Sequence, residues 1–398
     1  MASGWTSSSR LARWRGAAEV LAHLRGRPQV TRADLVRALG MSSGSATEIT
    51  GRLRAARLLT EVPAPVAGRG RPTTVLRPHP LGPLVLALEL KHEEWRSTLV
   101  GVDGVLRPGP ARRHRGREPA AVLADLAGAV QEAHRRHPGR VRAVSLSVAA
   151  TVRDGHLVQA STLGWRSVDL APLVAGTDSP LLVGNDATLA GVAEARTGAA
   201  AGARTALHLL VEVGIGGSLI VDGFPVASAR GAGGEYGHLP FGDRSLPCPC
   251  GAHGCWDLEV DGRALARHLG EAAPEDPRTY AQQVLQRASG AGPGSALREA
   301  ARTVSTALAA GTAGLVNAHD PDVVTLGGLA VLLRAAASDA FDAAYLAGLM
   351  AYRRQDAPPV LDAAHQDDGA LDGAAAVGLD HLTSESALAA WAEQVPRA

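Results

Sequence analysis

The chain has 398 residues, which is long enough for two or three domains with buried cores. With 46% hydrophobic and 20% charged residues, it has the composition of an ordinary globular protein. No run of about 18 apolar residues occurs, and the first residues, MASGWTSSSR, lack the apolar core of a signal peptide. These features argue against a membrane-spanning protein, and we expect a soluble, cytoplasmic one.

The net charge of +1 hides an asymmetry along the chain. Residues 1–80 contain thirteen arginines and four acidic residues, so this segment carries a charge of +9. The remainder of the chain therefore carries −8. A basic segment joined to an acidic body predicts a module that binds a polyanion such as DNA.

Three helices are predicted in the basic segment. The first covers residues 17–24, and the second follows the capping residue Thr31 and ends at Gly40. After a short turn, a third helix runs from about Ser43 to Arg57. Two short helices joined by a glycine-containing turn are typical of a helix-turn-helix.

The third predicted helix has one apolar and one polar face. Ile49, Leu53 and Ala56 face inward, because they are spaced by four and three residues. Side chains on the other face can reach base edges near the start of the helix and phosphates further along. We expect the DNA contacts of this helix to come from Ser45, Thr47, Glu48, Arg52 and Arg54.

A hairpin wing is predicted after the third helix. Strands at 58–61 and 74–76 flank the segment 68–72, in which Arg69 and Arg71 lie between glycines and a proline. An arginine at such a tip is suited to a narrow minor groove. Residues 1–82 are therefore predicted to form a winged helix-turn-helix domain with a proline-rich linker. The alternative is a basic module that contacts another protein.

Strands alternate with helices in the acidic body, residues 83–398. Two hairpins are expected, one formed by 84–90 and 97–102 and followed by a turn at 103–104, and the other formed by 207–212 and 218–221 around a glycine turn. This order predicts an α/β chain with the two duplicated lobes of the actin-like, ribonuclease-H-like ATPase fold. We place one lobe at about 83–187 with the C-terminal helix and the other at 188–379. The expected strands begin at residues 84, 97, 141, 207, 218 and 323.

All three cysteines of the chain, Cys248, Cys250 and Cys255, lie within eight residues of one another. His238 precedes the first of them by ten residues. Three thiolates and one imidazole are a ligand set for tetrahedral zinc, and the intervening glycines allow sharp turns. We predict one structural Zn²⁺ per chain in a reducing compartment. The alternative is three unrelated cysteines that happen to lie close together.

The same stretch carries a resemblance to a known family. The motifs EYGH at 235–238, CPCG at 248–251 and GCWD at 254–257 resemble the signature G-E-x-G-H…C-x-C-G-x-x-G-C-x-E of the ROK family (repressors, open reading frames and sugar kinases). One position departs, because Asp257 stands where the family has Glu. The tripeptide GRP at 70–72 also resembles the wing of ROK regulators.

The resemblance implies a sugar site and the two-lobed fold. Asn185 and Asp186 match the family's N-D-A motif, in which the Asn orients the sugar and the Asp is the general base of the kinases. Glu235, His238 and Asp257 match the remaining sugar contacts. The family's sugar-facing V-x-x-P-G-x-V loop reads VAATV at 148–152, without the Pro-Gly.

Of the two expected phosphate-binding hairpins, the first lacks its glycines and the second has Glu212 in place of its first glycine. The ROK kinase motif D-x-G-G-T reads ELKHE at 89–93, and the motif G-T-G-I-G-G-G reads EVGIGGS at 212–218. A carboxylate at Glu212 about 5 Å from a phosphate would cost roughly 3 kcal/mol at an effective dielectric of 20. We therefore expect no catalytic residue, with Asp186 only in the vestigial general-base position, and no sugar kinase activity.

We interpret the chain as a ROK-type transcriptional regulator, with repression favoured. Its expected partners are double-stranded operator DNA, a sugar-type effector that it does not phosphorylate, and further copies of itself in a homodimer or homotetramer. Two alternatives stay open. One is an active ROK sugar kinase fused to a DNA-binding domain, and the other is a ligand-independent DNA-binding regulator whose body only dimerises.

Overall fold

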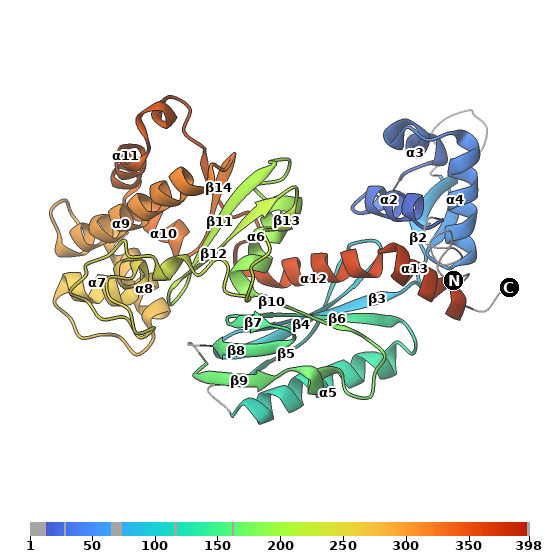
Figure 1. The fold of residues 1–398 in the computed structure, drawn as a ribbon, viewed down its shortest axis with the longest axis horizontal. Coiled ribbons are helices and arrows are strands. Elements are labelled where there is room, and N and C mark those ends of the chain that lie inside the picture. Colours follow the sequence, from blue (N-terminus) through green and yellow to red (C-terminus); the bar gives the residue numbers. More distant parts are fainter. Residues whose placement is uncertain (1–12, 28, 65–73, 115–117, 161–162, 396–398) are drawn as a thin grey trace. The chain divides into compact units, whose positions relative to one another are not determined.

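The computed structural model describes residues 13–27, 29–64, 74–114, 118–160 and 163–395 (Figure 1). Contacts divide the chain into two compact units, which are described separately below. No helix among the described residues is long and apolar enough to cross a membrane. Unit 1 comprises Met1–Ser147, Val168–Val183 and Ala374–Ala398, and unit 2 comprises Val148–Ser167 and Gly184–Gly373.

Unit 1 begins with the predicted winged helix-turn-helix. Thr31 and Asp34 form a capping box at the start of the second helix, and Gly40 ends it in the left-handed conformation at φ 61°. Ser42 caps the third helix by accepting from Ser45 N. Arg69 and Arg71 lie outside the described residues. The elements are α2 (Arg15–Leu24), α3 (Arg32–Leu39), α4 (Ser43–Ala55), β1 (Leu59–Pro63) and β2 (Thr74–Pro78).

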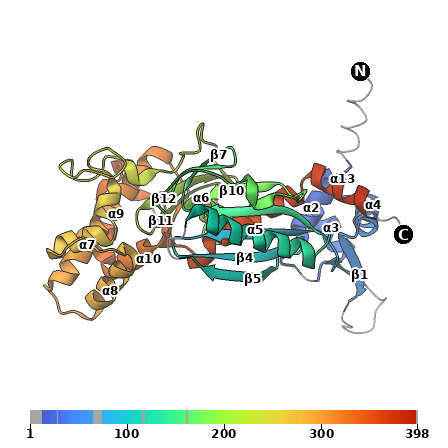
Figure 2. The ribbon, with the colours of Figure 1, turned by 90° about the horizontal axis from the view of Figure 1, so that it is seen from below.

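The body of unit 1 is a five-stranded sheet of order β10-β6-β3-β4-β5. α5 (Pro119–Arg136) lies along one side of this sheet, and the C-terminal part of α12 (Gly369–Leu382) lies along the other (Figures 1 and 2). Every residue of the central strand β3 is buried, as expected of a strand covered on both faces. The strands are β3 (Leu84–Leu90), β4 (Glu94–Gly101), β5 (Leu106–Arg113), β6 (Val141–Val148) and β10 (Leu181–Asn185).

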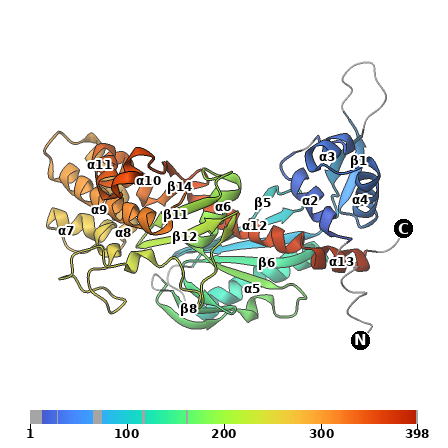
Figure 3. The ribbon, with the colours of Figure 1, turned by 45° about the horizontal axis from the view of Figure 1, so that its top comes forward.

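Unit 2 repeats this arrangement around a sheet of order β13-β12-β11-β14-β15. α6 packs on β11 and β12, while α10 packs on β11 and β14 beside the long helix α9 (Figure 3). Each sheet begins with consecutive antiparallel strands, and in unit 2 β14 then pairs in parallel with β11 and β15. The two similar sheets agree with the predicted two-lobed fold. The elements are α6 (Asp186–Thr197), β11 (Thr205–Val211), β12 (Ile215–Val221), β13 (Phe224–Pro225), α9 (Ala296–His319), β14 (Val323–Gly328), α10 (Leu329–Ala336) and β15 (Val360–Asp362).

The remaining elements cover the edges of the two units. A three-stranded sheet of order β7-β8-β9 accounts for the segment 148–167, which packs in unit 2 although we grouped it with the first lobe. A Cβ at Gly231 would lie 2.0 Å from Val152 O, so this segment packs against the loop that leads to the cysteines. The elements are β7 (Thr151–Arg153), β8 (His156–Ala160), β9 (Trp165–Asp169), α7 (Gly262–Leu269), α8 (Pro277–Gly290), α11 (Ser338–Gly348) and α13 (Glu385–Gln394).

Two strands begin three residues earlier than predicted. β4 begins at Glu94 and not at residue 97, and β12 begins at Ile215 and not at residue 218. In each hairpin the turn is closed by a short backbone bond, from Lys91 N to Glu94 O at 2.8 Å and from Glu212 N to Gly214 O at 3.0 Å. The polar and glycine-rich residues for which we predicted longer turns therefore belong to the paired strands.

The buried carboxylate of Glu194 holds three segments of unit 2 together. Glu194 lies near the end of α6 and is 1% exposed. Its oxygens accept hydrogen bonds from Ala199 N at 2.7 Å, Ala364 N at 3.0 Å and His365 N at 2.8 Å. Because a buried charge is stable only when it is hydrogen-bonded, this carboxylate joins α6 to the turn before α12.

We predict that Glu194→Ala lowers the free energy of unfolding by roughly 2–4 kcal/mol, because three part-buried N–H groups lose their charged acceptor. Urea denaturation followed by circular dichroism measures this loss. The control is Glu275→Ala, which removes an exposed carboxylate of the same unit. Equal stability of the two variants would contradict the prediction.

Candidate functional site

The loop that carries the cysteines is anchored to the core of unit 2. It runs between two single turns of 3₁₀-helix, Tyr236–His238 and Trp256–Glu259. The indole of Trp256 is fully buried and donates to Ala307 O of α9 at 2.9 Å. A Cβ at Gly311 of α9 would lie 2.2 Å from this ring, so the helix has a glycine where the tryptophan packs.

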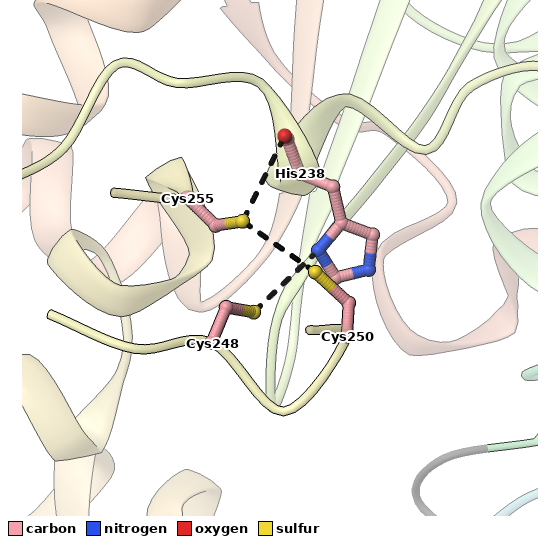
Figure 4. A group of neighbouring side chains, drawn as sticks. All are labelled: His238, Cys248, Cys250 and Cys255. Atoms are coloured by element: carbon pink, nitrogen blue, oxygen red, sulfur yellow. Dashed lines mark hydrogen bonds between the residues drawn. The ribbon is translucent and has the colours of Figure 1, made fainter. Parts of the chain in front are cut away.

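The structure brings the four predicted metal ligands together. The ligand atoms of His238, Cys248, Cys250 and Cys255 lie within 4.8 Å of one another. Figure 4 shows the three thiols and the imidazole converging, with Cys248 Sγ 3.9 Å from His238 Nδ1 and Cys250 Sγ 3.7 Å from Cys255 Sγ. Gly251 and Gly254 turn the backbone with φ of 97° and 70°.

The donor set fits a soft or borderline divalent cation. Three sulfur atoms and one imidazole nitrogen are the number and kind of ligands that close a tetrahedral metal site. Burial raises the pKa of the Cys255 thiol to about 12 when no cation is present. A bound cation favours the thiolate form, so a metal would supply the charge that this cluster lacks.

His238 has a second face outside the cysteine cluster. Its Nδ1 lies 3.6 Å from Asp257 Oδ2 as well as near Cys248, whereas its Nε2 lies 4.0 Å from Glu235 Oε2. The histidine is thus positioned between the candidate metal ligands and a predicted sugar ligand. The ROK resemblance implied a role for it in binding both metal and sugar, and that role stays a prediction.

Asp257 is tied to the hairpin of β11 and β12. Its Oδ1 accepts a hydrogen bond from Ile215 N at 2.6 Å. A Cβ at Gly237 would lie 1.8 Å from the same oxygen, and a Cβ at Gly214 would lie 3.1 Å from it. The hairpin and Gly237 therefore pack closely around this carboxylate.

Asn185 caps α6 and continues into the same network. Its side-chain oxygen accepts from Thr188 N at 3.1 Å, and its amide donates to Ala150 O at 3.2 Å. Asp186 follows as the first residue of the helix, with Oδ1 accepting from Ala187 N at 2.9 Å. The helix-cap role and the predicted ligand role therefore fall on the same residues.

Thr151 joins the two halves of the predicted sugar site. Its hydroxyl donates to Glu235 Oε1 at 2.8 Å, and it directly follows Ala150, which accepts from Asn185. We did not predict Thr151 as a site residue. The signal for it was its place in the segment 148–152, which aligns with the sugar-facing loop of the family.

Both hairpins that were expected to bind phosphate have charged residues that form ion pairs. In unit 2, Arg278 of α8 pairs with Glu212 and, at 3.0 Å, with Asp367. In unit 1, Glu89 is 3% exposed and pairs with Arg96 and, at 3.7 Å, with Lys91. Arg278 was not predicted, because its distance from Glu212 along the sequence gives no signal of contact.

The recognition helix α4 presents a polar face. Ser45, Thr47, Glu48 and Arg54 are exposed, as predicted, while Ala46, Thr50 and Leu53 are buried. Arg52 is only partly exposed, and its guanidinium pairs with Glu48 at 2.6 Å. The side chain of Arg54 is more exposed than that of Arg52, at 53%, and its guanidinium lies 3.6 Å from the carboxylate of Glu61.

Comparison with known proteins supports both parts of this architecture. The ROK family matches residues 111–381, and the MarR family matches residues 15–70. A solved ROK family transcriptional regulator, described as a homologue of the E. coli MLC protein, superposes with a TM-score of 0.76 at 19% identity, over 97% of this chain and 100% of that one.

Curated relatives include both kinases and a repressor. A glucokinase of Streptomyces coelicolor is 28% identical over 40% of this chain and 50% of its own length. A putative xylose repressor of Caldicellulosiruptor is 30% identical over 30% of this chain and 33% of its own length. The chain therefore spans about half the length, or less, of these relatives. Because the family match covers more than half of the chain and the fold agrees with it, the protein belongs to the ROK family and combines its sugar-kinase-like domain with a MarR-type winged helix-turn-helix.

Proposed function

We propose that this protein is a transcriptional regulator, most simply a repressor, that binds operator DNA through its winged helix and senses a sugar or sugar derivative without phosphorylating it. One zinc ion per chain stabilises the effector site. The protein acts in the cytoplasm as a homodimer or homotetramer on an inverted repeat, because a symmetric oligomer presents two winged helices to two half-sites.

The observation that carries the proposal is the double contact of His238. One face of the imidazole meets the cysteine cluster and the other meets Glu235, so a metal that fixes the loop also fixes a predicted sugar ligand. Zinc bound by His238, Cys248, Cys250 and Cys255 would have four protein ligands and therefore a structural role. The residues of the chain would then bind and orient the effector.

The effector chemistry follows from the side chains around His238. Glu235 and Asp257 offer carboxylate oxygens, Thr151 a hydroxyl, and Asn185 and Asp186 an amide and a carboxylate. Groups of this kind accept and donate hydrogen bonds as the hydroxyls of a sugar require. The curated relatives are proteins of sugar metabolism by their descriptions, which agrees with a carbohydrate ligand.

The absence of phosphoryl transfer is part of the proposal. A nucleotide's phosphates are bound by backbone N–H groups of glycine-rich turns, which charged side chains obstruct. Glu212 with Arg278 and Glu89 with Lys91 place such side chains at the two hairpins. Because some relatives are kinases, the alternative of an active sugar kinase with a DNA-binding domain stays open.

For the metal, we predict about one equivalent of zinc in the purified protein and its loss in Cys250→Ser, because a hydroxyl is a poor zinc ligand. Elemental analysis of both proteins measures this. The control is His253→Asn, which changes a neighbouring side chain outside the cluster and should retain the metal. Full zinc content in Cys250→Ser would rule out the assignment.

For DNA, we predict that Arg54→Ala weakens operator binding about equally across sequences and reduces the salt slope by about one, because one phosphate contact is lost. Fluorescence anisotropy at several salt concentrations measures both quantities. Arg302→Ala removes an exposed arginine of unit 2 and should leave DNA binding unchanged. Equal behaviour of the two variants would contradict the role of α4.

For the effector, we predict that a thermal-shift panel of sugars and sugar phosphates identifies a ligand that changes operator affinity. Glu235→Gln and Asp186→Asn should still bind operator but respond about tenfold or more weakly, because a hydrogen bond to a charged group contributes roughly 1.5–3 kcal/mol. Asp154→Asn, an exposed carboxylate of the same unit, is the control. Sugar-dependent ADP release that disappears in Asp186→Asn would restore the kinase alternative.

A further inference from the structure

The C-terminal helix α13 contacts the DNA-binding domain within unit 1. The indole of Trp391 is 7% exposed and donates a hydrogen bond to Ala56 O at 2.7 Å. Ala56 is the C-terminal capping residue of the recognition helix α4. Backbone carbonyls at a helix C-terminus have no partner within the helix, so Trp391 supplies a buried donor to a group that needs one.

A second contact lies at the end of helix α2. The guanidinium of Arg25 donates to Thr383 Oγ1 at 2.7 Å and to Leu379 O at 3.3 Å, and it lies 3.7 Å from Asp380 Oδ1. Arg25 is the C-terminal capping residue of α2. The DNA-binding domain is therefore attached at the ends of two of its helices, α2 and α4, to the last helices of the chain.

The helix α13 is itself fixed to the body of unit 1. Arg142 of β6 donates to Gln394 Oε1 at 2.6 Å, and Ser384 caps the start of α13 by accepting from Ala387 N. Trp391 and Gln394 of α13 thus bond to different parts of unit 1, the first to the DNA-binding domain and the second to the sheet. A helix held at both sides transmits orientation from the sheet to the recognition helix.

We propose that Trp391 and Arg25 are positioning residues that set the orientation of the recognition helix on unit 1, and thereby the half-site spacing that the oligomer accepts. This inference rests on the proposed function as an operator-binding oligomer. Two half-sites are read together only when both recognition helices face the groove at one fixed separation. If the DNA-binding domain is attached more loosely, one oligomer can bind half-sites at several separations. Its affinity for the preferred separation then falls.

The alternative is that Trp391 is only a buried aromatic that stabilises unit 1. The chain provides a matched control, because Trp95 of β4 is 1% exposed in the same unit and its Nε1 has no hydrogen-bond partner among the described residues. Trp391→Phe and Trp95→Phe remove the same atoms from a buried site, but only the first removes a bond to the DNA-binding domain. Arg25→Gln is likewise matched by Arg27→Gln, because among the described residues the guanidinium of Arg27 bonds only locally, to His23 Nδ1 and His23 O near the end of α2.

The experiment uses full-length protein and an operator selected by that protein from random duplexes. Affinities are measured by anisotropy for the native spacing, for insertions and deletions of one and two base pairs, and for a single half-site. Two base pairs rotate one half-site by about 70° relative to the other, since a helical turn is about 10–10.5 base pairs.

We expect the wild type, Trp95→Phe and Arg27→Gln to lose about tenfold or more in affinity when the spacing changes by two base pairs. Trp391→Phe and Arg25→Gln should bind the native spacing about threefold more weakly and lose little more when it changes, and their half-site affinity should match the wild type. A wild-type spacing profile in Trp391→Phe overturns the proposal, as does a weakened half-site affinity, which would show damage to the winged helix itself. If the wild type selects no DNA, the proposed function fails and this inference with it.

Discussion

The irregular loop that follows His238 depends on cross-links between its own side chains. Apart from an isolated bridge between Pro247 and His253, described residues 239–255 form neither helix nor strand, and backbone bonds such as Gly242 N to Gly254 O at 2.9 Å join the loop to itself. At the C-terminal end of the loop, Trp256 anchors it in the core beside α9, and the next residue, Asp257, accepts a hydrogen bond from Ile215 N. The loop and His238 at its start supply three thiols and an imidazole, which a shared cation would join strongly. A bound metal would therefore fix His238 together with the loop.

The charged residues in the former phosphate loops act differently from what their sequence suggests. A lone carboxylate at Glu212 would repel a nucleotide by roughly 3 kcal/mol. The ion pair with Arg278 cancels much of that repulsion, because the guanidinium lies against the carboxylate. In the function that we propose, the pairing itself hinders phosphate binding, because Arg278 already has two carboxylate partners, Glu212 and Asp367.

The sequence predicted the parts of this protein that depend on local rules. The capping box at Thr31, the turn at Gly40 and the cysteine spacing each follow from interactions within a few residues, and the structure contains all three. The contacts of Thr151 with Glu235, of Arg278 with Glu212 and of Trp391 with Ala56 join residues far apart in the chain. No periodicity or motif encodes such pairs, because they exist only after the sheets and helices have packed.

An effector can change DNA binding only if it binds the DNA-competent and DNA-incompetent arrangements with different affinity. That difference in affinity has to arise in elements that are connected to the proposed effector site. α6 begins at the ligand residues Asn185 and Asp186, and Glu194 near its end holds the turn that leads into α12. α12 belongs to unit 2 as far as Gly373 and to unit 1 beyond it, and the chain continues directly into α13 and its contact with α4. A helix is stiff along its axis, so in the function that we propose a shift of α6 on binding a sugar would be passed to α12 as a whole. Coupling between sugar and DNA then requires only that α6 occupies two positions, of which the effector selects one.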